Sequence, residues 1–108
     1  MMEPVIQDAD LETLFNAQTG RVSWGELERA FARGVLIRVD AGLDLVAVAC
    51  CVARDEALTL QDWMTARQVA SVSMEEAQVW SSTGAHFWAV VAAPFVLVQE
   101  IPAERSIT

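Results

Sequence analysis

Lysine is absent from this 108-residue sequence, and basic residues of any kind are few. The seven basic residues are all arginines and stand against fifteen acidic residues, so the net charge is −8. Recognition of phosphate groups requires a positive patch, whereas these arginines are scattered along the chain with acidic residues among them. We therefore expect no binding to nucleic acid. An anionic membrane surface would repel the chain as well.

A hydrophobic run of membrane-spanning length is also absent. The longest uninterrupted apolar run, residues 87–98, has twelve residues and contains Pro94, whereas a spanning helix needs about 18. The N-terminal sequence MMEPVIQDAD is acidic and lacks the apolar segment of a secretory signal. These features predict a cytoplasmic protein with no membrane partner.

Clusters of reactive residues are missing too. Cys50 and Cys51 are adjacent, so they cannot join distant segments, and they lack the spacing of a redox or zinc motif. We interpret them as small buried hydrophobic residues. The single histidine, His86, has only helix-end residues near it in sequence, and the glycines are isolated instead of forming a phosphate loop. We predict no catalytic, metal-binding or cofactor-binding residue; an enzyme, the less favoured alternative, would use His86 with a nearby acid.

Apolar spacing and capping residues predict the helices. Ser23 with Glu26 and Ser73 with Glu76 have the spacing of capping boxes. Residues 45–53 fit a strand by their alternating valines, but their alanines, their length and Asp44 as a cap favour a buried helix. Helices are predicted over residues 11–18, 24–33, 45–53, 56–67 and 74–82.

Three short β-branched or apolar segments predict strands at residues 35–40, 87–92 and 95–100. Both faces of the last two are apolar, so we expect them to be mostly core. Pro94 cannot donate a ladder hydrogen bond, which places it at a bend and favours an edge position for one neighbouring strand. The sequence predicts an α+β fold: a small, mainly antiparallel sheet of about three strands covered by four to five helices. It predicts one domain over residues 1–108, with flexible ends at 1–9 and 102–108.

Large apolar side chains provide the remaining signal for function. Trp is enriched at protein interfaces, although a Trp at helical spacing belongs more often to the core. Gln99 and Glu100 end an apolar strand, either because the chain emerges into water there or because they line a pocket at the strand end. The predicted interaction surface consists of Trp80, Trp88, Phe95, Val96, Val98, Gln99 and Glu100.

Four segments, WGEL, FARGVLIRVD, LDLVAVA and WAVVAAPFVLVQE, together resemble a family of short bacterial proteins known as domain of unknown function 2288. The resemblance covers about residues 23–100, most of the chain. It implies a bacterial origin, a small stand-alone protein and no assigned activity. It brings no catalytic residues with it.

The absence of a catalytic constellation beside many large apolar residues favours a non-enzymatic protein-interaction module. We expect its partner to be a second copy of the chain, as a homodimer, or another protein. One alternative is a small-ligand-binding regulatory domain with a pocket between sheet and helices. The other is an acidic adaptor or decoy for a basic partner, which requires acidic residues gathered on one face.

Overall fold

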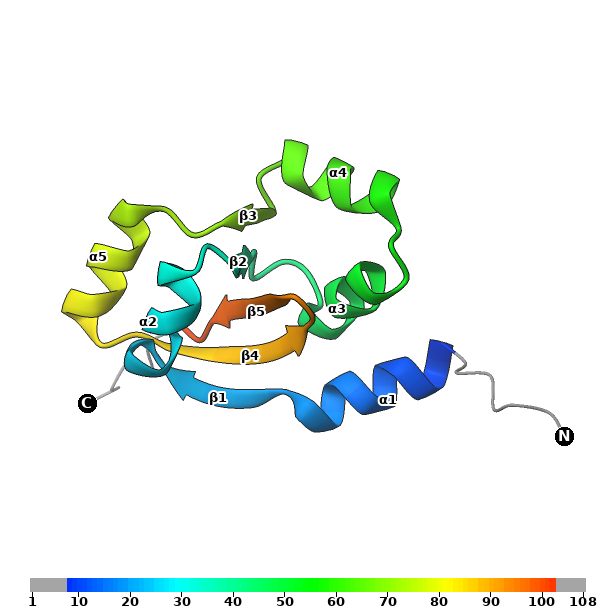
Figure 1. Cartoon of the computed structure of the whole chain (residues 1–108), viewed down its shortest axis with the longest axis horizontal. Coiled ribbons are helices and arrows are strands. Elements are labelled where there is room, and N and C mark those ends of the chain that lie inside the picture. The colour runs from blue at the N-terminus through cyan, green and yellow to red at the C-terminus, as the bar shows by residue number, and fades with distance from the viewer. Residues whose placement is uncertain (1–7, 103–108) are drawn as a thin grey trace, which may run out of the picture.

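The computed structural model describes residues 8–102, which form five helices and one five-stranded sheet (Figure 1). The helices are α1 (Asp8–Gln18), α2 (Trp24–Ala32), α3 (Leu45–Ala53), α4 (Ala57–Thr65) and α5 (Met74–Thr83). The strands are β1 (Gly20–Ser23), β2 (Leu36–Val39), β3 (Val69–Ser71), β4 (His86–Ala92) and β5 (Phe95–Glu100). The predicted flexible ends lie outside the described residues, except for residues 8, 9 and 102.

The sheet is mixed and has the strand order β1-β4-β5-β2-β3. Three neighbouring pairs are antiparallel, and β2 runs parallel to β5. The α+β class is confirmed, but the expected number of about three strands was too low. The two missed strands, β1 and β3, have four and three residues and lie at the two edges of the sheet. Strands this short do not contain enough residues to show an alternating pattern.

The expectation that Pro94 marks an edge strand was wrong. Both β4 and β5 are interior strands, and Ala93-Pro94 forms the tight turn that joins them. Proline is tolerated there because a residue in the turn donates no ladder hydrogen bond. The hairpin register pairs Ala92 with Phe95 and Val90 with Leu97, so the apolar run folds back on itself in the middle of the sheet.

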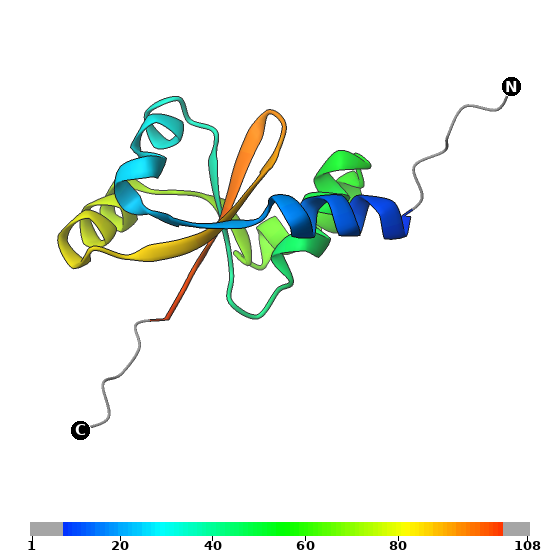
Figure 2. The ribbon, with the colours of Figure 1, turned by 90° about the horizontal axis from the view of Figure 1, so that it is seen from below.

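Helices cover both faces of the sheet. Figure 2 shows α2 and α5 on one side and α1, α3 and α4 on the other. Side chains alternate between the two faces along each strand, so neighbouring residues of β5 enter different clusters. Leu97 packs with Val48 and Phe15 under α1 and α3, whereas Val98 packs with residues of α2 and α5.

Within the described residues, no helix is long and apolar enough to cross a bilayer.

An aromatic cluster forms the core beneath α2 and α5. The Trp80 and Phe87 rings meet edge to face at a centroid distance of 4.8 Å. Trp24 contacts Trp80 at 5.9 Å and Phe31 at 5.7 Å. Such contacts add roughly 0.5–1.5 kcal/mol each to the burial of the rings. Trp80 therefore belongs to the core, because its indole fills the space between α5 and β4.

Polar caps fix the helix starts as the sequence predicts. Asp44 accepts hydrogen bonds from the backbone N–H groups of Val46 and Ala47, which confirms the helix over 45–53. In α5, the Ser73 hydroxyl accepts from the Glu76 N–H, and the Glu76 carboxylate accepts from the Ser73 N–H. The second oxygen of Glu76 lies 2.7 Å from Arg38 Nε, an ion pair by distance although not aligned as a hydrogen bond. This cap consequently also joins α5 to β2.

We predict that Ser73→Ala lowers the free energy of unfolding by about 1 kcal/mol, because the Glu76 N–H loses its acceptor. Urea denaturation followed by far-ultraviolet circular dichroism measures this. Ser81→Ala, an exposed position in the same helix, is the matched control and should change stability by less than about 0.5 kcal/mol. Equal effects of both substitutions would show that the cap contributes nothing specific.

Candidate interaction surfaces

The structure separates the seven residues of the predicted interaction surface. Trp80 and Val98 are buried in the core and cannot meet a partner in this fold. Trp88 is 43% exposed, and Glu100 is exposed at the end of β5. Phe95, Val96 and Gln99 are partly buried. The sequence placed them together because they are adjacent, whereas alternation along β5 directs them to opposite faces of the sheet.

Gln99 has a structural role that the sequence pattern did not reveal. Its side-chain Nε2 donates to the backbone oxygen of Asp40 at 2.9 Å and to that of Leu43 at 2.7 Å. The turn between β2 and α3 is further tightened by hydrogen bonds from Gly42 N to Asp40 Oδ2 and from Leu43 N to Asp40 O. Gln99 thus fastens the turn that leads to the cap of α3.

A groove lies between α2 and the β4–β5 hairpin, with a volume of about 380 Å³. We call it the α2 groove. Its floor is apolar and includes Val91, which is 57% exposed, and Val96. Its helical wall carries two arginines, Arg29 and Arg33. The full lining is Glu26, Arg29, Ala30, Arg33, Val35, Val91, Ala93, Pro94 and Val96.

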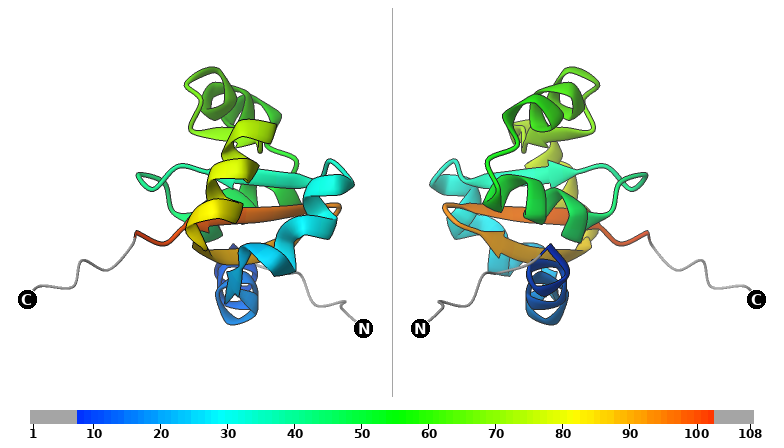
Figure 3. Two further views of the ribbon diagram at one scale, coloured as in Figure 1. Left: turned by 90° about the vertical axis from the view of Figure 1, so that its left-hand side faces the viewer. Right: turned by 90° about the vertical axis from the view of Figure 1, so that its right-hand side faces the viewer.

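A second apolar region, the α4 surface, lies on the other face. Helix α4 has no buried residue, although its sequence ALTLQDWMT is rich in large apolar side chains. Leu58 is 79% exposed and Met64 58% exposed. Beneath the helix is a pocket of about 210 Å³, lined by Ile37, Val52, Leu60, Met64, Val69, Ala70, Ser71, Phe95 and Leu97. Figure 3 shows α4 standing at the β3 side of the molecule, away from α1.

The strand ends form a third hollow, of about 440 Å³, that contains the only histidine of the sequence. Arg21, His86 and Glu100 all contribute to its lining, so the structure brings His86 and a carboxylate to one cavity. Within residues 8–102, no hydrogen bond or ion pair joins the side chains of His86 and Glu100. A catalytic base acts through hydrogen-bond contact with a nucleophile or an orienting acid, and the His86 side chain makes no such contact among the described residues. The hollow combines these polar side chains with apolar ones such as Val79 and Ile101.

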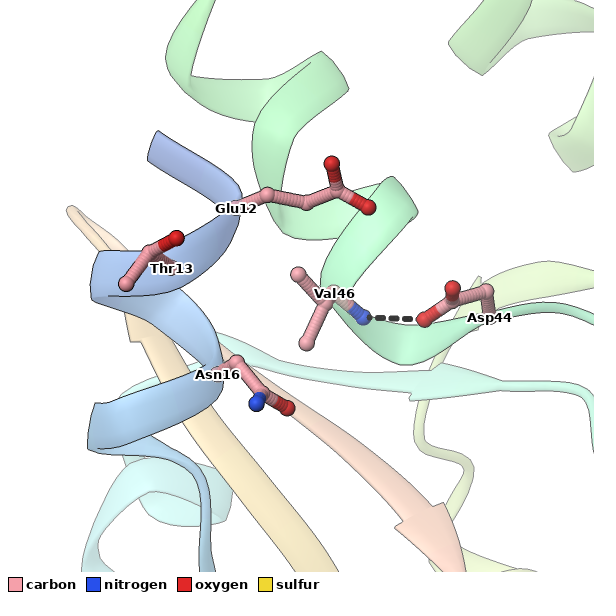
Figure 4. A pocket seen from close by; sticks show the side chains of 5 residues that line it. All are labelled: Glu12, Thr13, Asn16, Asp44 and Val46. Atoms are coloured by element: carbon pink, nitrogen blue, oxygen red, sulfur yellow. Dashed lines mark hydrogen bonds between the residues drawn. The ribbon is translucent and has the colours of Figure 1, made fainter. Parts of the chain in front are cut away.

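A fourth hollow, of about 410 Å³, separates α1 from the start of α3 and is polar (Figure 4). The Glu12 side chain extends from α1 toward α3, and Asn16 lies one turn further along. Asp44 lines the opposite wall, but its carboxylate is engaged in capping α3. Among the described residues, no three His, Cys, Asp or Glu side chains are grouped to hold a metal ion.

The two cysteines form no disulfide, and they differ in environment. Cys50 is buried in the core under α3, as the sequence predicts. Cys51 is only partly buried. Burial, reinforced by a hydrogen bond and by the negative charge of Glu56, raises the pKa of the Cys51 thiol from 9.0 to about 11. A thiolate is the reactive form of cysteine, and this shift keeps the Cys51 thiol protonated at neutral pH.

We predict that Gln99→Leu lowers the free energy of unfolding by about 1–3 kcal/mol, because the Leu43 carbonyl loses its donor in a part-buried site. Chemical denaturation measures the loss, and amide hydrogen exchange at Gly42 and Leu43 should become faster. The exposed neighbour Glu100 provides the control, since Glu100→Gln leaves the turn intact. An unchanged exchange rate in Gln99→Leu would contradict the role assigned to this side chain.

Alkylation of Cys51 by iodoacetamide should rise with pH along a curve centred near 11. Because Glu56 helps to raise this pKa, Glu56→Gln should shift the curve to lower pH; an identical curve would exclude the contact.

The thiol also links stability to pH. The unfolded chain releases this proton near pH 9.0 and the folded chain near 11. The protonated Cys51 thiol therefore makes its full contribution to the free energy of unfolding below pH 9. This contribution is lost as the pH rises toward 11.

Comparison with known proteins places the chain in a family. The family model described as protein of unknown function (DUF2288) matches residues 10–100. The solution NMR structure of PA1075 from Pseudomonas aeruginosa is similar over 100% of both chains, with 32% sequence identity and a TM-score of 0.77. No curated protein matches the chain. Two of the segments that carry the resemblance also meet in space, since the Gln99 side chain of WAVVAAPFVLVQE donates to the Leu43 carbonyl of LDLVAVA. The chain belongs to the DUF2288 family of proteins of unknown function.

Proposed function

We propose that this chain is a non-enzymatic protein-interaction module that binds its partner through the α4 surface. The observation that carries the proposal is that α4 exposes Leu58 and Met64 and buries none of its residues. An exposed apolar surface next to an apolar pocket is typical of a binding site in a folded chain. Burial of one such side chain is worth about 1.5–3 kcal/mol.

The partner in this proposal is a second copy of the chain or another protein. Self-association through the edge of the C-terminal strand has no support, because β5 is hydrogen-bonded on both sides. We place the self-association contact on the α4 surface instead. Phe95, a residue of the predicted surface, lines the pocket under α4, so the apolar hairpin still contributes to the contact.

A small-ligand-binding domain is the second candidate. It is favoured by the hollow at the strand ends, where Arg21 and Glu100 offer charges of opposite sign around an apolar lining that includes Val79 and Ile101. A ligand bound there would raise the melting temperature. The acidic adaptor has less support, because exposed acidic residues occur on helices at both faces of the sheet. They include Asp10, Glu12, Glu28, Asp62 and Glu75.

We also propose a single domain with a bacterial origin and a cytoplasmic location. The bacterial origin is supported by the relative from Pseudomonas aeruginosa. The single domain is supported by the one five-stranded sheet of residues 8–102, and the location stays a prediction.

Native mass spectrometry of the untagged chain isolated from its own host tests the main proposal. We expect a homodimer or a complex with another protein, and we expect Leu58→Glu to abolish it because a charge cannot enter an apolar contact without a partner. Met74→Glu is the control, since Met74 is also a large apolar side chain, 64% exposed, but lies on α5. A chain that is always monomeric and alone, or a complex that survives Leu58→Glu, would refute the α4 surface.

A further inference from the structure

The α2 groove combines two properties that occur together nowhere else among the hollows described above. Its floor is apolar and exposed, and its wall bears two arginines. We propose that the α2 groove binds an acidic amphipathic segment of a partner protein. The site lies on the opposite face of the sheet from the α4 surface, so the proposal stands or falls independently of the proposed function.

The helical wall follows from the spacing of α2 residues. Glu26, Arg29 and Ala30 of α2, with the C-cap residue Arg33 that follows it, stand at i, i+3, i+4 and i+7, which places them on one face of the helix. The opposite stripe, with Trp24 and Leu27, is buried in the core. Burial of that stripe fixes the rotation of the helix, and Arg29 and Arg33 line the groove.

The groove has a positive wall in a chain whose net charge is −8. Within residues 8–102, neither Arg29 nor Arg33 forms an ion pair. The one carboxylate of the lining, Glu26, accepts a hydrogen bond of 2.8 Å from the Ser23 backbone and is thereby held at the start of α2. The two arginines are therefore available to carboxylates of a ligand, which guanidinium groups recognise well.

The apolar floor of the α2 groove determines which kind of acidic ligand fits it. Val91 and Val96 are direct partners across the β4–β5 hairpin, and their side chains point to the α2 face. Helices cover Val96 partly and leave Val91 57% exposed. An aliphatic side chain placed on Val91 would bury apolar area while a neighbouring carboxylate meets Arg29 or Arg33. This pattern suits an acidic amphipathic peptide. It does not suit a nucleic acid, which requires many more cationic contacts than two arginines supply.

The test uses a fluorescein-labelled helical peptide with a leucine stripe flanked by glutamates as the probe, titrated with the purified chain. Fluorescence polarisation measures binding, and NMR shift mapping of the labelled chain locates it. We expect shifts at Ala30, Val91 and Val96. The double variant Arg29→Gln, Arg33→Gln should bind roughly tenfold more weakly, because two charge contacts are lost. The double variant Arg54→Gln, Arg67→Gln has the same net charge and should bind like the native chain.

The apolar floor is tested separately. Val91→Thr keeps the shape of the exposed side chain and should weaken binding several-fold, and raised salt should weaken it further. Three results would overturn the proposal: no binding of the peptide, equal loss in the two arginine double variants, or shifts that map to α4 instead of the α2 groove. Equal binding of a polyglutamate peptide without leucines would also overturn it, since the floor would then have no part in recognition.

Discussion

Burial of both faces of the β4–β5 hairpin is the constraint that organises this molecule. Phe87 and Val98 point to one face and are fully buried, and Val90 and Leu97 do the same on the other. Each such side chain contributes about 1.5–3 kcal/mol only if water is excluded from it. One layer of helices cannot achieve this for two faces, so the chain divides its helices between the two sides of the sheet.

The same constraint explains why the sheet is mixed. An interior hairpin needs a hydrogen-bonded neighbour on each side. β1 pairs with β4, and β2 pairs in parallel with β5, which the chain reaches from β2 through α3, α4, β3, α5 and β4. Gln99 then ties the end of β5 to the turn after β2. This contact joins segments that are 56 residues apart, and it couples the capped start of α3 to the central hairpin.

Local chemistry predicted the helices, and tertiary packing decided most of what could not be predicted. Asp44, Ser23 and Ser73 marked helix starts because a cap acts within three residues of its own position. β1 and β3 were missed because their pairing partners, not their own residues, make them strands. The site prediction failed at Trp80 and Val98 for a related reason. A pattern shows that a side chain shares a face with its neighbours, but it does not show whether another element covers that face.

The distribution of exposed apolar residues has a physical origin in the size of the chain. A chain of 108 residues leaves roughly a third of its potential surface in water. The apolar side chains that stay exposed include Val91 near the hairpin end on one face and Leu58 of α4 on the other. Neither residue belongs to the two core clusters or packs against them. The fold therefore does not depend on these side chains, so polar residues could stand at both positions without loss of the core. The large apolar side chains at these two positions are therefore free to make the contacts proposed above.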